Sequence, residues 1–331
     1  MVNILKSNQP FVIVFILLSA VGLWIFNLID PVVYEFAFDQ NKMIFYNIAS
    51  QFFSYKSFGS ILTTFILLVF QGFLLVQFNR KYILINYRTY LPAFFYILIA
   101  SSFVPIQRIN PVILGTLFVF IATNFIYDIY RRDYALNRLY MAGFFVSLAS
   151  LFWAPFAAFF LVIWIALTIL RPFIGREWIV SLFGFITPFL FVFTYYYVFV
   201  DVAQLNMLVD DYLNHFKILR VFNPIHYAYY IFYALLFLIV LFASFTVLSN
   251  YQKKKIKTRK YFEINWWMFF IGIILFVFFN NVGYEILFFI SIPISFLITE
   301  YFYTVRVNWF LNILLLLLLG SLVHIQIIAH Y

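Results

Sequence analysis

The chain has 331 residues, of which 66% are hydrophobic and only 10% are charged, and 24% of all residues are aromatic. A soluble globular domain carries about a quarter charged residues and just under half apolar ones. This composition excludes a soluble domain and predicts that a lipid bilayer is the solvent. Cysteine is absent, which excludes disulfides, thiolate metal sites and thiol nucleophiles.

The formal net charge of +9 does not indicate a nucleic-acid partner, because the lysines and arginines lie in short segments between apolar ones. That distribution is typical of a polytopic membrane protein, which orients itself by basic residues in its cytoplasmic loops. We therefore expect contacts with membrane lipids and none with nucleic acid. The abundance of Phe, Ile, Tyr, Asn and Lys with few glycines is typical of AT-rich bacterial genomes, so we expect a bacterial inner membrane.

A transmembrane helix needs about 20 predominantly apolar residues to cross the ~30 Å hydrocarbon core. Apolar segments follow one another along the whole chain, and the sequence predicts an all-α, polytopic fold with ten or eleven transmembrane helices in one transmembrane domain, residues 1–331. In chain order the segments are Phe11–Ile29, Phe58–Phe78, Leu91–Val104, Pro111–Tyr127, Leu139–Phe152, Pro155–Leu170, Trp178–Val200, Tyr227–Ser249, Ile264–Phe279, Ile286–Tyr303 and Val307–Ile325.

The stretch from 139 to 170 decides between ten and eleven crossings. It is too long for one span, and Trp153-Ala154-Pro155 supplies a break, because proline lacks a donor and disfavours helix in the preceding residue. We expect a tight hairpin of two helices there, with a single crossing as the alternative.

Basic residues set the predicted orientation. With the N-terminus inside and eleven crossings, 16 of the 21 lysines and arginines lie on the cytoplasmic side, and the C-terminus lies outside. The longest outside segments are residues 30–57 and 201–226. The inside loop 250–263 carries six basic residues, which fits either a solvated loop or contact with anionic lipid.

The first outside segment places three carboxylates directly after the first crossing: Asp30, Glu35 and Asp39. If the chain is helical after Pro31, Glu35 and Asp39 are four residues apart and share one face. Carboxylates among interfacial aromatic residues can act as a general base or as ligands of a divalent metal. The simpler interpretation is that they cap a helix that begins at Asp30-Pro31.

The second outside segment has the apolar spacing of an amphipathic surface helix. Asp211 and His215 lie four residues apart on it, a spacing that fits a metal site, an acid–base pair or an ordinary salt bridge. Arg220 and His226 follow near the next crossing and are candidates for holding a phosphate, as is Arg108 in the short turn before Pro111.

The stretch from about Leu23 to Arg171 resembles the GT-C superfamily of polytopic membrane glycosyltransferases. A first crossing is followed by an outside loop that begins with Asp30, and then by short apolar segments that contain Leu91-Pro92-Ala93 and Trp153-Ala154-Pro155. The resemblance implies that Asp30 is a catalytic base or metal ligand and that the sugar arrives on a polyprenyl phosphate. That family often has a further acidic residue where this chain has Gln107-Arg108-Ile109-Asn110.

Three functions therefore stay open. The first is a polyprenyl-phosphate-sugar-dependent transferase, with Asp30, Glu35 and Asp39 as its catalytic carboxylates and Arg108, Arg220 and His226 on the phosphate. The second is a transporter or flippase for a lipid or other amphipath, which predicts a cavity lined by tyrosine and asparagine side chains such as Asn124 or Asn280. The third is a non-catalytic subunit of an envelope or secretion complex, bound to partner membrane proteins. The whole chain also resembles bacterial integral-membrane families to which no activity is assigned.

Overall fold

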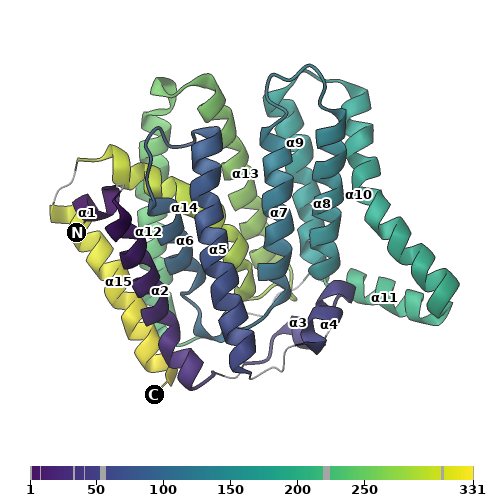
Figure 1. The fold of residues 1–331 in the computed structure, drawn as a ribbon, viewed down its shortest axis with the longest axis horizontal. Helices are drawn as coiled ribbons and strands as arrows, with labels where there is room; N and C mark the ends of the chain where they lie inside the picture. The colour runs from purple at the N-terminus through teal and green to yellow at the C-terminus, as the bar shows by residue number, and fades with distance from the viewer. Residues whose placement is uncertain are drawn as a thin grey trace.

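The computed structural model describes residues 2–7, 9–32, 34–40, 42–52, 57–218, 224–306 and 309–330. Within these ranges the chain is helical, with no strand beyond an isolated bridge between Ile218 and Phe279. The helices form one elongated bundle (Figure 1). The predicted all-α fold is confirmed.

The helices are numbered along the chain, with η for 3₁₀ and π segments. The elements are α1 Val2–Lys6, α2 Pro10–Ile29, α3 Ala37–Gln40, α4 Ile44–Gln51, α5 Phe58–Tyr82, α6 Leu91–Ala100, η1 Val104–Ile106, α7 Pro111–Tyr127, α8 Leu136–Phe152, η2 Ala154–Phe159, α9 Phe160–Leu170, α10 Gly175–Tyr195, η3 Tyr196–Val200, α11 Val202–Asn214, α12 Tyr227–Ser249, η4 Tyr251–Lys253, α13 Ile256–Phe278, η5 Tyr284–Ile286, α14 Leu287–Thr304 and α15 Trp309–His330.

Seven helical segments among the described residues are long and apolar enough to cross a membrane. They are Pro10–Ile29, Phe58–Tyr82, Gly175–Val200, Tyr227–Ser249, Ile256–Phe278, Tyr284–Thr304 and Trp309–His330. The other four predicted segments coincide with shorter apolar helices, namely α6, α7, α8 and the continuous stretch Ala154–Leu170. The chain is therefore a multi-pass membrane protein by the length and composition of its helices.

The loops gather at two opposite ends of the bundle (Figure 1). At one end, Lys6 donates to the carbonyl of Val305, Thr258 donates to the carbonyl of Ile83, and Tyr87 stacks on Tyr303. All 16 basic residues that the sequence assigns to the cytoplasmic side belong to segments of this end, which we call the basic end. The opposite end holds the described residues 30–32, 34–40, 42–52, 101–110, 201–218 and 279–286, and we call it the acidic end. The N-terminal helix lies at the basic end and the C-terminus at the acidic end.

The stretch from 139 to 170 is a helical hairpin, as predicted. α8 ends at Phe152, Trp153 is extended, and a 3₁₀ segment leads into α9. Arg171, which follows α9, donates to the carbonyl of Ile129 at 3.2 Å, so the hairpin returns to the loop from which α8 begins.

Two helices at the centre carry the bundle core. All ten residues of α6 are buried, and so are 15 of the 18 residues of α14. At 1.5 Å per residue, α6 spans only about half of the hydrocarbon core. The predicted span Leu91–Val104 is therefore too long: the helix ends at Ala100, and the chain continues to Asn110 in a buried, largely non-helical segment.

Helices α8 and α10 approach each other through two glycines. A Cβ atom on Gly143 would collide with the carbonyl oxygen of Ser181, and one on Gly184 would collide with the carbonyl oxygen of Tyr140. Small residues permit such close backbone contact between helices in lipid. Beyond this contact α10 contains Pro188, which removes a helical hydrogen bond, and the rest of the helix diverges from the bundle toward α11 (Figure 1).

We predict that Gly143→Ala destabilises the protein, because its new methyl group forces backbones apart at a cost of about 1–3 kcal/mol. Thermal unfolding in a mild detergent should show a lowered midpoint. Gly320→Ala is the matched control, because no atom lies within 4 Å of the Cβ position there. Equal midpoints for the two variants would contradict the close packing of α8 on α10.

Candidate functional site

The buried segment Ser101–Asn110 is the structural centre of the acidic end. Its backbone polar groups are bonded by side chains from other helices: Asn27 donates to the carbonyl of Gln107 at 3.2 Å, Ser60 accepts from the amide of Ile109 at 2.9 Å, and Tyr46 donates to the carbonyl of Ile109 at 3.3 Å. Non-helical backbone at membrane depth persists only where it is buried in protein or lines a cavity. Helices α2, α4 and α5 therefore hold this segment in place.

Arg108 is buried, with only 5% of its surface exposed, and forms an ion pair with Asp39. Its two terminal nitrogens contact the two carboxylate oxygens, with Nη1 3.1 Å from Oδ1, and Nη2 also donates to the carbonyl of Tyr34 at 3.2 Å. The rings of Phe36 and Phe38 lie 5.4 and 5.3 Å from the guanidinium carbon. This pairing neutralises Arg108 and ties the first outside segment to the buried turn.

The expected helix after Pro31 is not present. Residues 34–36 are non-helical and α3 begins only at Ala37, so Glu35 and Asp39 do not share a helical face. Asp39 turns back instead, and its Oδ2 accepts from the amide of Phe36 at 2.9 Å. Asp30 follows the last turn of α2 rather than beginning a helix. The interaction of Arg108 with Asp39, which joins residues 69 apart, favours this conformation over a continuous helix.

Asp30 and Glu35 remain exposed at the surface of the acidic end. Neither carboxylate makes a hydrogen bond or an ion pair with the described residues. Among the described residues, Asp39 is thus the one predicted catalytic carboxylate that contacts a predicted phosphate ligand.

The predicted pair in the second outside segment has a different geometry. His215 caps the end of α11 and is buried, and its Nδ1 lies 2.8 Å from the backbone oxygen of Asp211, not from the carboxylate. Burial lowers the pKa of His215, while the hydrogen bond to Asp211 and the charge of that residue act in the opposite direction. No group of three or more metal-binding side chains occurs among the described residues. Asp211 and His215 thus do not form a metal-binding cluster with a third ligand there.

Of the two remaining phosphate candidates, only His226 belongs to the described residues, and no contact joins it to Arg108 there. His226 caps the start of α12, where its Nδ1 accepts from the amide of Ala228 at 3.4 Å, and its side chain is exposed. Arg220 lies outside the described residues.

An aromatic cluster connects the buried turn to the C-terminal helices. Phe103 stacks on Tyr284 with ring centroids 4.3 Å apart and contacts Tyr229 at 4.9 Å. Tyr284 in turn lies parallel to Tyr233, whose hydroxyl is 3.5 Å from the hydroxyl of Ser102. The two irregular segments of the acidic end, 101–110 and 279–286, meet in this cluster.

A groove of about 420 Å³ opens beside the aromatic cluster, between α12, α13 and α14. Tyr230, Tyr233 and Tyr284 lie at its end nearest the cluster. The remaining lining is apolar and comes from Ile225, Leu236, Phe237, Val240, Phe269, Ile273, Phe276, Ile286, Leu287, Ile290 and Ile294. The groove therefore has an end formed by three tyrosines and an apolar body of aliphatic and phenylalanine side chains.

A second groove of about 550 Å³ lies between α5 and α7. Asn124 lines it near the basic end, together with Gln77 and Lys81. Lys81 is 2.9 Å from the side-chain oxygen of Asn124 and 3.2 Å from the carboxylate of Asp128. Asn124 therefore lines a groove, but among the described residues no tyrosine lines that groove with it, and Asn280 is not among the residues that line the groove beside Tyr284.

Residues 40–331 match a family described as a family of unknown function (DUF6427). The chain belongs to this family. The match begins within the first outside segment, after Asp39, and covers the whole of the bundle from α4 onward. No curated protein and no solved structure matches the chain.

The sequence analysis did not identify Tyr230 and Tyr233 as site residues. A signal exists in the run Tyr227-Ala228-Tyr229-Tyr230, which places several tyrosines in the first turns of a transmembrane helix, where aromatic residues mark the interface. Their meeting with Tyr284 depends on the packing of α12 against α14, which no spacing along the chain reveals.

We predict that Arg108→Gln destabilises the protein by about 3 kcal/mol, because it leaves the carboxylate of Asp39 partly buried without its partner. Denaturant unfolding in detergent measures the loss. The double variant Asp39→Asn, Arg108→Gln should lose less than the sum of the two single variants. Glu35→Gln is the control and should leave stability unchanged because Glu35 is exposed. Strictly additive effects would contradict the ion pair.

Proposed function

We propose that this protein binds an amphipathic lipid in the groove between α12, α13 and α14 and moves it across or within the membrane. The observation that carries the proposal is the groove itself, about 420 Å³ in volume, with three tyrosines at one end and an apolar body. Ligand pockets combine an apolar lining with a few polar groups that fix orientation.

The lining fixes how such a lipid would lie. From Tyr284 to Ile294 and from Tyr230 to Val240 the groove follows ten residues of each helix, or about 15 Å along the axis. That distance reaches from the acidic end to about the middle of the hydrocarbon core. A polar head beside Tyr230, Tyr233 and Tyr284 and an acyl or prenyl chain against Leu236, Val240 and Ile294 match this distribution.

The interruption of α6 supports transport of the lipid rather than its simple storage. Secondary transporters often build their substrate sites from discontinuous helices, whose irregular backbone lies around the ligand. Here α6 stops at Ala100, and Phe103 of the following irregular segment stacks on Tyr284 at the end of the groove. A change in the packing of this stack would alter the polar end of the groove directly.

Sugar transfer from a polyprenyl phosphate is the second candidate, and the exposed carboxylates of Asp30 and Glu35 favour it. We rank it lower because Arg108, the predicted ligand of the lipid phosphate, already pairs with Asp39. If Asp30 is the base, Asp30→Asn removes activity in vivo without lowering expression. Full function of that variant would exclude Asp30 from catalysis.

We further propose eleven crossings in a bacterial inner membrane, with the basic end in the cytoplasm. The short helices α6 to α9 then complete their crossings with the irregular segments that extend them. The support is the separation of charge: cytoplasmic loops of such proteins carry the excess of lysine and arginine.

If the lipid binds in this groove, a bulky side chain should weaken lipid binding only where it enters the groove. Ile273→Trp should fill it and reduce lipid that copurifies in a mild detergent several-fold, as measured by native mass spectrometry. Ile274→Trp is the matched control, since Ile274 neighbours it on α13 and is 49% exposed but does not line the groove. If both variants retain the same lipid, the groove is not the binding site.

The orientation predicts opposite labelling of the two ends. Because the chain has no cysteine, Asp201→Cys and Lys253→Cys each introduce a unique thiol. A membrane-impermeant maleimide should label Asp201→Cys in intact spheroplasts and label Lys253→Cys only after permeabilisation. The reverse order would invert the orientation, and labelling of both in intact spheroplasts would exclude eleven crossings.

A further inference from the structure

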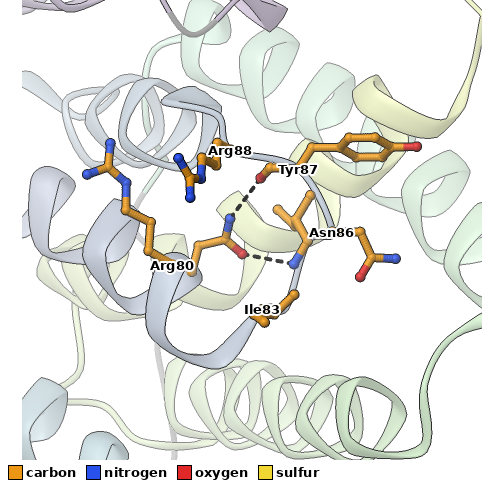
Figure 2. Close-up of a pocket in the computed structure, with 7 residues that line it drawn as sticks. Arg80, Ile83, Asn86, Tyr87 and Arg88 are labelled. Atoms are coloured by element: carbon orange, nitrogen blue, oxygen red, sulfur yellow. Dashed lines mark hydrogen bonds between the residues drawn. The ribbon is translucent and has the colours of Figure 1, made fainter.

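A second site lies at the basic end, formed by the last turn of α5 and the loop that joins α5 to α6. Residues Asn79, Arg80, Ile83, Ile85, Asn86, Tyr87 and Arg88 surround a pocket of about 510 Å³ (Figure 2). Arg80 and Arg88 extend on one side of this loop, and Asn86 and Tyr87 extend on the other (Figure 2). No acidic residue lines the pocket.

The loop is held in a defined conformation by one buried side chain. Asn79, which is 3% exposed, accepts from the amide of Ile85 at 2.8 Å and donates to the carbonyl of Tyr87 at 3.3 Å. Ile83 adopts a left-handed conformation with φ of 55°, which is uncommon for a β-branched residue. Strain of this kind persists where the surrounding contacts over-determine the backbone, and it is concentrated at functional sites.

The ends of the loop are fixed as well. Thr258 of α13 donates to the carbonyl of Ile83 at 3.1 Å, and Thr89 accepts from the amide of Leu91 at 3.2 Å. Tyr87 stacks on Tyr303 with ring centroids 4.0 Å apart. The last turn of α5 and the fixed loop therefore present Arg80 and Arg88 from a rigid base, which reduces the entropy lost on binding.

The charges of the two arginines are not neutralised within the described structure. Arg80 donates to the hydroxyl of Tyr90 at 3.3 Å, which orients it, and Arg88 makes neither an ion pair nor a side-chain hydrogen bond with the described residues. Four of the five acidic residues of this end have other partners: Asp128 with Lys81, Glu177 with Arg171, Glu263 with Tyr251 and Glu300 with Lys254. The fifth, Asp133, is exposed in the loop between α7 and α8.

From this geometry we infer that Arg80 and Arg88 form a binding site for a phosphate-bearing anion. Arginine matches phosphate by parallel N–H donors from a planar group, and Arg80 at the end of α5 and Arg88 in the rigid loop together supply several such donors. Either the headgroup of an anionic lipid or a soluble phosphate carries this chemistry. The site lies at the opposite end of the bundle from the tyrosine-ended groove and is independent of the function proposed for that groove.

The test is ligand-dependent thermal stability of the full chain in a neutral detergent. Phosphatidylglycerol, inorganic phosphate and phosphatidylcholine are titrated separately against the protein and against Arg80→Ala and Arg88→Ala. We expect phosphatidylglycerol to raise the unfolding midpoint and each arginine variant to bind it about tenfold more weakly. Lys253→Ala is the control, because it removes an exposed cation at the same end that does not line the pocket.

The separate titrations distinguish a lipid headgroup from a soluble phosphate. An arginine-dependent effect of phosphatidylglycerol alone assigns the site to a lipid headgroup, and the same effect with inorganic phosphate assigns it to a soluble phosphate. An equal loss in Lys253→Ala would overturn the site in favour of diffuse surface charge, and so would the absence of any effect with both anions. An unchanged elution volume and an unchanged unfolding midpoint in the absence of ligand establish that each variant folds. If Arg88→Ala does not fold, Arg88→Lys, which retains the charge, replaces it.

Discussion

A lipid bilayer offers no water to backbone amides and carbonyls, so each of them must find its partner inside the protein. This constraint is most demanding at Ser101–Asn110, where the chain leaves the helical conformation while fully buried. Asn27, Ser60 and Tyr46 reach the segment from three other helices and bond it. The short α6, the ion pair of Arg108 and the position of Phe103 all depend on that set of contacts. The tyrosine-ended groove lies beside the segment, and Phe103 stacks on Tyr284 at the tyrosine end of the groove.

Charged residues are distributed unevenly between the two ends of the bundle. The basic end concentrates 16 of the 21 lysines and arginines, and its acidic residues mostly pair with them or with tyrosine hydroxyls. The basic residues that have no acidic partner among the described residues lie close to the expected plane of the lipid headgroups. Arg80 and Arg88 are held there by the end of α5 and the rigid loop that follows it. The acidic end has exposed carboxylates at Asp30 and Glu35 and a neutralised Arg108. The two ends therefore offer different chemistry to ligands.

Hydropathy and charge were sufficient to predict the helical multi-pass architecture, because both indicate whether a segment lies in lipid or in water. The hairpin at Trp153 also followed from local chemistry, since proline lacks a backbone donor and disfavours helix in the residue before it. The prediction of a helix after Pro31 was wrong because Asp39 bonds to Arg108 far along the chain. The predicted length of α6 was wrong because side chains of other helices, such as Asn27 and Ser60, bond the backbone of the segment that follows Ala100. The pairing of Asp211 with His215 through the backbone and the groove between three helices likewise depend on three-dimensional packing.

The central claim is that the groove between α12, α13 and α14 holds an amphipathic lipid. A high-resolution cryo-electron microscopy map of the protein in nanodiscs made from total bacterial lipid tests it most directly. The account predicts elongated density along Leu236, Val240 and Ile294 that ends in a polar head beside Tyr233 and Tyr284. A map in which these side chains are well resolved while the groove is closed or has no ordered density would contradict it.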